Sequence, residues 1–247
     1  MRQTDKDRTR ESIQIKPYKK DASYSYTLGA FPTYELILNK PKEIVKVLIH
    51  SGYTDMDNLK ELCARNNIPV EINDKLIGRL SDKDNCYVAG VFSKYGCRLA
   101  KDKPHIVLVN PSNMGNLGTI LRTSLGFGIY DIAIILPGAD IFNPKCVRAS
   151  MGAMFSLNFQ LYNSFDDYRR QYDRHDVYTF MINEERTVDI RDCPKSKLFS
   201  LVFGNEASGL DDSFLEVGTS VMIPQSSHVD SLNLTIAVGV AAYEFTR

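Results

Sequence analysis

The chain has 247 residues, of which 43% are hydrophobic and 24% charged, a mixture typical of soluble globular proteins that leaves room for one large or two ordinary domains. Lysine plus arginine and aspartate plus glutamate both number 30, so no overall basic field indicates nucleic acid, and any RNA contact must come from a local patch. The five cysteines form no C-x-x-C motif, the four histidines lie outside metal-ligand spacing, and no apolar run reaches about 18 residues. We therefore expect a cytoplasmic protein with no membrane contact and no metal.

The first 20 residues carry seven basic side chains, three acidic ones and few apolar ones. This pattern is typical of a solvated tail, and an arm that binds phosphate groups is the alternative. Tyr24, Tyr26 and Phe31 follow among small residues. We expect these aromatic side chains to fill the core of the domain behind them, with stacking on bases as the second interpretation.

Helix and strand patterns alternate between residues 34 and 95. The expected elements are strands at 43–50, 68–72 and 87–92 and helices at 55–66 and 75–80. They predict a small α/β domain of about 60 to 70 residues, which is too small to hold a cofactor crevice of its own. Residues 96–104 are polar, begin with glycine and end with proline, so we place the linker to the next domain there.

The rest of the chain alternates apolar strands with helices. Strands are expected at 105–109, 131–136, 155–161, 177–182, 198–203 and 221–225, and helices at 116–125, after 143, after Ser164 as the N-cap, and from about Ser231 onward. This alternation predicts a mainly parallel sheet with helices on both faces. Polar segments follow the strands at 198–203 and 221–225 and open the helix expected from about Ser231, so three loops are expected to converge on one pocket at the carboxyl edge of the sheet.

Arg122 lies on the helix expected at 116–125, whose other residues are largely apolar. An arginine beside an apolar face is costly to remove from water unless it is paired, so a phosphate or carboxylate partner is expected. The glycines of the preceding loop fit neither G-x-G-x-x-G nor G-x-x-x-x-G-K-[ST], which leaves the common nucleotide-binding interpretations with little support.

Four ordered segments carry a resemblance to a known family. They are N-P-S-N-M-G-N-L-G-T-I-L-R-T at 110–123, N-P-K-C-V-R-A-S-M-G-A-M-F at 143–155, G-N-E-A-S-G-L at 204–210, and I-P-Q-S-S-H-V-D-S-L-N at 223–233. Residues 104–247 thereby resemble the SpoU (TrmH-like) branch of the SPOUT RNA methyltransferases. The resemblance implies a parallel sheet with a C-terminal trefoil knot, against the usual rule that chains are unknotted. It also implies that residues 1–99 hold a basic segment and a small RNA substrate-binding domain.

For function, the resemblance implies that the methyl group of S-adenosylmethionine is transferred to a ribose 2′-hydroxyl of RNA. Carried over residue by residue, the catalytic positions are Asn116, Arg122, Glu206, Ser231 and Asn233, and the cofactor contacts are Gly204, Ile223 and Leu232. Arginine keeps its proton at neutral pH, so Arg122 is expected to hold a substrate phosphate, and the proton acceptor stays open. No metal is implied.

The target RNA is open at this stage. Ribosomal RNA is favoured, because the N-terminal domain resembles a ribosomal protein, and transfer RNA is the alternative. A catalytically silent RNA-binding relative and an adenine-nucleotide-binding module are the other interpretations.

The chain departs from the family motifs at three positions. Ala207 stands where glycine is usual, and Gln225 and Ser227 stand where methionine and glycine are usual. If position 227 requires a positive φ, serine adopts it only with strain, and the loop around the cofactor is shaped differently.

The last helix is small and apolar nearly all round, from Ala237 to Ala242. Such a helix must be covered on every side, and little chain remains to cover it. We therefore expect a homodimer through the C-terminal helix with close approach at Gly239, as the resemblance to dimeric SpoU enzymes also implies.

Overall fold

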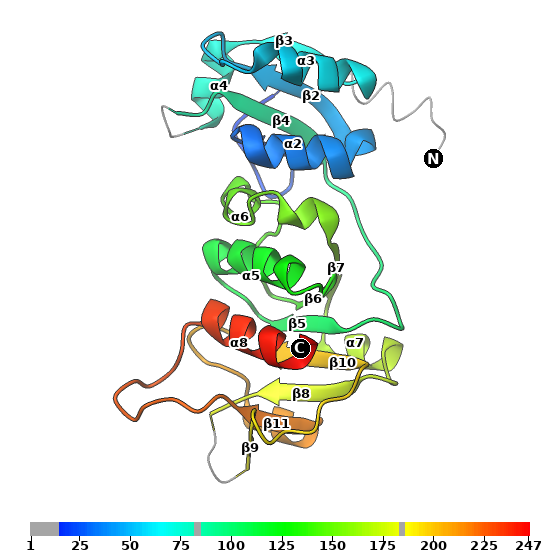
Figure 1. The fold of residues 1–247 in the computed structure, drawn as a ribbon, viewed down its shortest axis with the longest axis vertical. Coiled ribbons are helices and arrows are strands. Elements are labelled where there is room, and N and C mark those ends of the chain that lie inside the picture. The colour runs from blue at the N-terminus through cyan, green and yellow to red at the C-terminus, as the bar shows by residue number, and fades with distance from the viewer. Residues whose placement is uncertain (1–14, 82–84, 183–185) are drawn as a thin grey trace. The chain divides into compact units, whose positions relative to one another are not determined.

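A computed structural model describes residues 15–81, 85–182 and 186–247. The chain divides into two compact units, and Figure 1 shows the elements of each. The first unit contains the chain up to Tyr95 together with Phe142–Arg148, and the second contains Gly96–Ile141 and Ala149–Arg247. Most of the basic segment expected at residues 1–20 lies outside the described residues.

The first unit is built on a four-stranded sheet in the order β1-β4-β2-β3. Its strands are β1 Tyr24–Leu28, β2 Ile44–Ile49, β3 Val70–Ile72 and β4 Val88–Ser93, and its helices are α2 Ala30–Asn39, α3 Met56–Arg65, α4 Asp74–Leu80 and α6 Pro144–Ala149, of which the last residue belongs to the second unit. Only β2 and β3 pair in parallel. The elements expected between residues 43 and 92 are therefore all present.

Strand β1 and helix α2 were not expected from the sequence. Tyr26 is buried in the core, as predicted for a filling residue, but Phe31 is 56% exposed on α2 and fills nothing. Helix α2 is hard to recognise in the sequence for two reasons. Pro32 lies close to its start, and the exposed Phe31 and Leu38 interrupt the apolar periodicity of a helix.

Residues Phe142–Arg148 belong to the first unit although they lie between two strands of the second in the sequence. The Ser25 hydroxyl donates a hydrogen bond to the Phe142 carbonyl oxygen, and the Phe142 ring lies 6.3 Å from that of Phe92 and 5.5 Å from that of Tyr95. The predicted boundaries had assigned this segment to the second domain with its neighbours in sequence. Sequence order could not reveal its packing, because Phe92 and Tyr95 lie about 50 positions earlier and Ser25 lies 117 positions earlier.

The second unit contains a seven-stranded sheet in the order β7-β6-β5-β10-β8-β11-β9. Its strands are β5 His105–Val109, β6 Asp131–Ile135, β7 Asn158–Tyr162, β8 Asp176–Phe180, β9 Val188–Asp189, β10 Phe199–Phe203 and β11 Thr219–Met222, and its helices are α5 Met114–Gly126, α7 Phe165–Gln171 and α8 Leu234–Thr246, with short 3₁₀ turns at Ala153–Ser156 and Asp212–Glu216. Every pairing in it is parallel. The expected parallel sheet is confirmed, whereas the trefoil knot stays a prediction.

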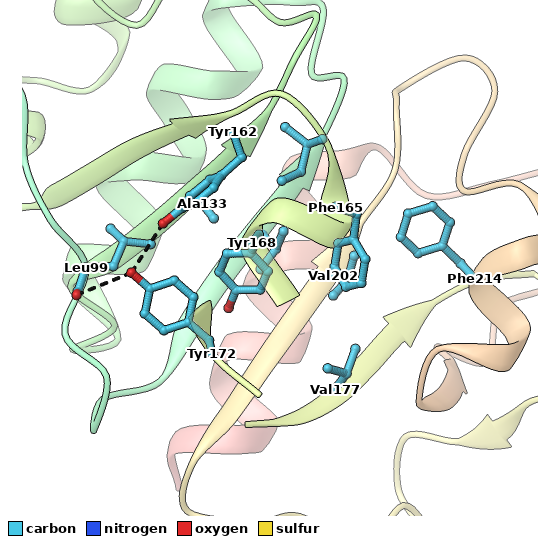
Figure 2. Packing of buried hydrophobic residues seen from close by; sticks show 11 residues of the cluster. Leu99, Ala133, Tyr162, Phe165, Tyr168, Tyr172, Val177, Val202 and Phe214 are labelled. Carbon is cyan, nitrogen blue, oxygen red and sulfur yellow. Dashed lines mark hydrogen bonds between the residues drawn. The ribbon is translucent and has the colours of Figure 1, made fainter. Parts of the chain in front are cut away.

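Helices cover both faces of this sheet. On one face, side chains of α7 pack with alternate strand residues such as Val177 and Val202, and Phe165 meets Phe214 at 5.1 Å between ring centroids (Figure 2). On the other face, Phe245 of α8 contacts the rings of Tyr178 and Phe199. The two-residue period of a strand sends neighbouring side chains to opposite faces, which is why both layers can be apolar.

A buried polar network ties the start of the second unit to the amino edge of this sheet. His105 and His175 bond through Nε2 to the carbonyl oxygens of Ala100 and Lys101, at 2.7 and 3.1 Å. Their Nδ1 atoms lie 2.8 Å from the Tyr168 hydroxyl and 3.0 Å from the Ser200 hydroxyl. Burial lowers the pKa of His105 to about 4 and lowers the pKa of His175 as well.

This network predicts a loss of stability in mild acid. Between pH 6.5 and about 4 the unfolded chain binds a proton at His105 that the folded chain rejects, so the free energy of unfolding falls as pH falls, by up to roughly 3 kcal/mol. Thermal melting from pH 7.5 to 5 should show this decrease. His105→Gln should lower the melting temperature at pH 7.5 and flatten its pH dependence, whereas the same change at exposed His228 should leave the profile as in the wild type. If the melting temperature of His105→Gln fell with pH as steeply as that of the wild type, the acid sensitivity could not be assigned to His105.

Within the described residues, no helix is long and apolar enough to cross a membrane. No group of three histidine, cysteine, aspartate or glutamate side chains in those ranges could hold a metal ion. The cytoplasmic location expected from the cysteines stays a prediction.

Candidate functional site

A cavity of about 430 Å³ opens at the carboxyl edge of the second unit's sheet. Its walls come from the ends of β8, β10 and β11 and from the segment that leads into α8. The lining residues are Phe180–Ile182, Phe203–Leu210, Asp212, Val221, Ile223, Gln225, Asp230–Leu232, Leu234 and Ala237. The three loops expected to converge, those after β10, after β11 and before α8, therefore all line one cavity. The loop after β5 reaches it only indirectly, through Glu206.

The loop after β10 folds back on itself in a tight turn. Asn205 and Gly209 exchange both backbone hydrogen bonds, at 3.2 and 2.9 Å. A Cβ atom at Gly204 would lie 2.1 Å from the carbonyl carbon of Gly209 and 2.3 Å from the nitrogen of Leu210. Only glycine fits where two backbone segments approach this closely. Gly204, Ile223 and Leu232, the predicted cofactor contacts, all line the cavity.

Glu206 connects this loop to the loop after β5. Its carboxylate accepts hydrogen bonds from the Ser112 backbone and hydroxyl at 2.9 and 2.8 Å, from the Asn113 backbone at 3.0 Å and from the Asn116 carboxamide at 3.3 Å. Burial alone would raise the pKa of Glu206, but the hydrogen bonds from Ser112 and Asn113 outweigh it, and the pKa lies below its ordinary value. A carboxylate satisfied in this way is an anchor and a poor proton acceptor.

A second contact reinforces this anchor. The Asn205 carboxamide donates to the Asn110 carbonyl oxygen at 2.7 Å, and Asn110 has a positive φ of 51°. Asparagine tolerates this left-handed conformation better than most residues. Asn110, Ser112 and Asn205 were missed as functional candidates, although all three lie inside the quoted motifs.

The two predicted residues of α5 are placed differently. Asn116 is half-buried and bonds Glu206, whereas Arg122 is exposed and does not line the cavity. Within the single chain the Arg122 side chain therefore stays in water, and the phosphate partner expected for it stays a prediction. The described residues provide Arg122 with no hydrogen-bonded or ion-pair partner.

Ser231 and Asn233 also take different places. Ser231 lines the cavity, and Asn233 is the N-cap of α8, where its side-chain oxygen accepts from the Thr235 backbone at 2.8 Å. The helix begins at Leu234, so the prediction of a start at about Ser231 was too early. Both residues are small and polar, and sequence alone does not decide which one caps.

The departures from the family motifs cause no backbone strain. Among the described residues, positive φ angles outside glycine occur at Asn67, Asn110 and Met151 only. Ser227 and Ala207 are therefore in conformations that any residue adopts, and the strain anticipated at position 227 is absent.

Comparisons with known proteins identify relatives. The sequence profile described as the SpoU rRNA Methylase family matches residues 103–243. An uncharacterised tRNA/rRNA methyltransferase of Synechocystis is 33% identical over 143 residues, which are 58% of this chain and 52% of the relative. The 23S rRNA (adenosine(1067)-2'-O)-methyltransferase of Streptomyces azureus is 30% identical over 199 residues, which are 75% of this chain and 72% of the relative.

Solved structures agree with these relatives. The crystal structure of an AdoMet-bound rRNA methyltransferase from Sinorhizobium meliloti is similar with a TM-score of 0.76 and 26% identity, over 90% of this chain and 86% of that one. The match to the Synechocystis protein spans only about half of that relative's length. The family profile nevertheless covers more than half of this chain, including every motif that meets at the cavity. The chain belongs to the SpoU rRNA methylase family.

Proposed function

We propose that the protein transfers the methyl group of S-adenosylmethionine to a ribose 2′-hydroxyl of RNA. The observation that carries this proposal is the junction at Glu206, which joins two sequence motifs about 90 residues apart beside a single cavity. The Sinorhizobium structure contains AdoMet, and the Streptomyces relative is named for 2′-O-methylation. Both support the same chemistry here.

The residues around the cavity fit this cofactor. The volume of about 430 Å³ lies in the range of small-molecule sites. Ile223, Leu232 and Leu210 provide apolar walls, and Gly204 lets the backbone of Gly209 and Leu210 fold back against it, which shapes the loop that lines the cavity. The charged lining residues Glu206, Asp212 and Asp230 are all acidic, which suits a ligand with a sulfonium and an ammonium group.

The roles of the protein groups follow from their contacts. S-adenosylmethionine supplies, when bound, a methyl group activated by the positive sulfur. Asn116 and Glu206 hold the loop after β5 against the loop after β10, and so fix the edge at which the 2′-hydroxyl must be aligned. Arg122 is a cation free to take a phosphate of the RNA. It cannot act as a base, because arginine keeps its proton. Ser231 and Asn233 shape the third loop.

For the target, we propose ribosomal RNA, with transfer RNA as the alternative. The names of the Streptomyces and Sinorhizobium proteins, which both state rRNA, support this choice. The name of the Synechocystis protein includes both RNA classes. The first unit, with its separate α/β fold, is proposed as the substrate-binding part, because the cavity belongs wholly to the second unit.

The test is a map of 2′-O-methyl positions in total RNA from cells with and without the intact gene. Loss of one ribosomal position, restored by the wild-type gene, is the expected result. Loss at a tRNA position would keep the chemistry and change the target. An unchanged map, with no methyl transfer to bulk RNA in vitro, would indicate a silent RNA-binding relative. Tighter binding of ATP than of S-adenosylmethionine would indicate an adenine-nucleotide-binding module.

We also propose a homodimer through the C-terminal helix, on a face different from the one expected. Gly239 faces α5 of its own chain, because a Cβ there would lie 3.7 Å from Thr123, and Ala241 and Ala242 are buried. Ile236 and Tyr243, two turns apart, are instead 55% and 53% exposed. The ring of exposed Phe127 lies 6.2 Å from that of Tyr243 and extends this apolar face.

Sedimentation at micromolar concentration should give about twice the chain mass of 27.9 kDa. The double variant Ile236→Glu and Tyr243→Glu should sediment as a monomer, because it places two carboxylates in the interface. Leu161→Glu is the matched control, since Leu161 is 49% exposed in the same unit but lies on β7. A wild-type monomer, or dissociation by the control alone, would refute this interface.

A further inference from the structure

Most of the excess positive charge of the first unit lies in one group of lysines. Its described residues contain thirteen lysines and arginines and eight aspartates and glutamates. Five of the thirteen, defined here as the lysine strip, are Lys16, Lys19, Lys20, Lys40 and Lys94. One acid, Asp21, lies among them, so the rest of the unit holds eight cationic and seven anionic side chains. Most of the excess positive charge in this unit therefore resides in the strip.

Aromatic side chains lie between the lysines of the strip and connect them. The Lys94 ammonium lies 4.8 Å from the Tyr18 ring centroid and 5.8 Å from that of Phe142, and donates to the Lys20 carbonyl oxygen at 2.7 Å. The Lys40 ammonium lies 5.3 Å from the ring centroid of Tyr95, and the Tyr95 ring lies 5.5 Å from that of Phe142. Segments distant in sequence are thereby joined into one surface.

Backbone contacts fix the segment that carries three of these lysines. The Lys16 N–H donates to the Tyr24 hydroxyl at 3.3 Å, and the Tyr26 hydroxyl donates to the Lys16 carbonyl oxygen. Ile15, Tyr18 and Tyr24 pack against the core of the unit. Lys16, Lys19 and Lys20 are exposed and form no ion pair with a carboxylate of the described residues. The backbone that carries these lysines is therefore fixed in place, and their ammonium groups are available to an anion.

We propose that the lysine strip is the surface on which the first unit binds the phosphate backbone of the substrate RNA. This inference rests on the proposed function. Phosphate contacts position a nucleic acid without reading its sequence. The strip suits that task, because Lys16, Lys19 and Lys20 are exposed and have no carboxylate partner among the described residues, and an ammonium group binds phosphate as a point charge.

An anionic membrane would be attracted by the same charge. Membrane-binding surfaces place large apolar side chains among the cations. Of the exposed large apolar residues of this unit, Phe31, Leu38, Ile72 and Tyr87, only Leu38 lies close in sequence to a lysine of the strip, two residues before Lys40. The composition therefore favours RNA.

The test compares two triple variants of the full chain that remove the same charge. Lys16→Gln, Lys19→Gln and Lys20→Gln change the strip, and Lys60→Gln, Lys75→Gln and Arg79→Gln change α3 and α4. Filter binding of bulk ribosomal RNA and bulk tRNA is measured from 50 to 300 mM KCl. The strip variant should bind RNA at least roughly 10-fold more weakly. The slope of log affinity against log salt concentration should be reduced by about 2, because a protein with fewer phosphate contacts releases fewer counterions on binding.

The control triple should stay within about two-fold of the wild type in RNA affinity. Both variants should keep the wild-type melting temperature and S-adenosylmethionine affinity, because neither touches the second unit. Equal losses of RNA affinity in the two triple variants would refute the role of the lysine strip. The proposed methyl transfer is measured separately and would not be refuted by that result. A wild-type chain that bound neither RNA would overturn both proposals. Strip-dependent binding to phosphatidylserine vesicles, without strip-dependent RNA binding, would assign the surface to a membrane.

Discussion

Gly204→Ala should abolish cofactor binding. The added Cβ would lie 2.1 to 2.3 Å from backbone atoms of Gly209 and Leu210, and backbone cannot turn aside as the end of a flexible side chain can. The loop after β10 must move outward, away from the position in which it lines the cavity and holds Glu206 against Ser112. We expect S-adenosylmethionine affinity to fall at least 100-fold and stability to fall by about 3 kcal/mol, as for overpacked cores.

Gly126→Ala is the matched control. Gly126 is the last residue of α5, with nothing within 4 Å of an added Cβ, so alanine should be neutral or slightly stabilising there. Calorimetric titration and thermal melting measure both variants. If Gly204→Ala melts as the wild type and binds the cofactor within three-fold, the close approach of the two backbone segments does not shape the site.

The sequence predicted elements best where a strand is buried on both faces. The run at His105–Val109 is bounded by Pro104 and Asn110, and its expected and observed limits agree. Strand β9 has only two residues, Val188 and Asp189, and lies in a polar segment where no period can be recognised. Strand β1 and helix α2 were missed because Gly29 and Pro32 indicate a loop, whereas tertiary packing supports a helix there.

The sequence predicted which residues belong to the site, but it did not predict how they contact one another. The motifs named Asn116 and Glu206, but spacing could not show that a carboxylate at 206 would bond backbone groups at 112 and 113. That contact depends on β10 pairing beside β5, a neighbour relation that local patterns do not encode. The exposure of Arg122 could not be read from spacing either, because the apolar residues near it in sequence, Leu117, Ile120 and Leu121, lie on the buried side of the helix.

Arg122 is exposed on α5, and this position determines what its removal should change. Gly115, Thr119 and Arg122 are exposed along one side of α5, while Leu117, Ile120 and Leu121 are buried. The guanidinium thus stands on the solvent side of the helix whose first turn carries Asn116. An unpaired cation in that position costs little in the free protein and gains a partner only when a phosphate arrives. Removal of the Arg122 guanidinium should therefore weaken methyl transfer to RNA and leave the stability of the fold unchanged.

Arg122→Ala should reduce methyl transfer at least 100-fold under single-turnover conditions, since loss of one charged group that positions a substrate typically costs this much. Cofactor affinity should stay within about three-fold and melting should be unchanged, because Arg122 neither lines the cavity nor bonds a described residue. Arg122→Lys should recover only part of the rate, since an ammonium cannot contact a phosphate through two parallel hydrogen bonds. Loss of S-adenosylmethionine binding in a folded Arg122→Ala protein would place the guanidinium on the cofactor side and refute its proposed role with RNA.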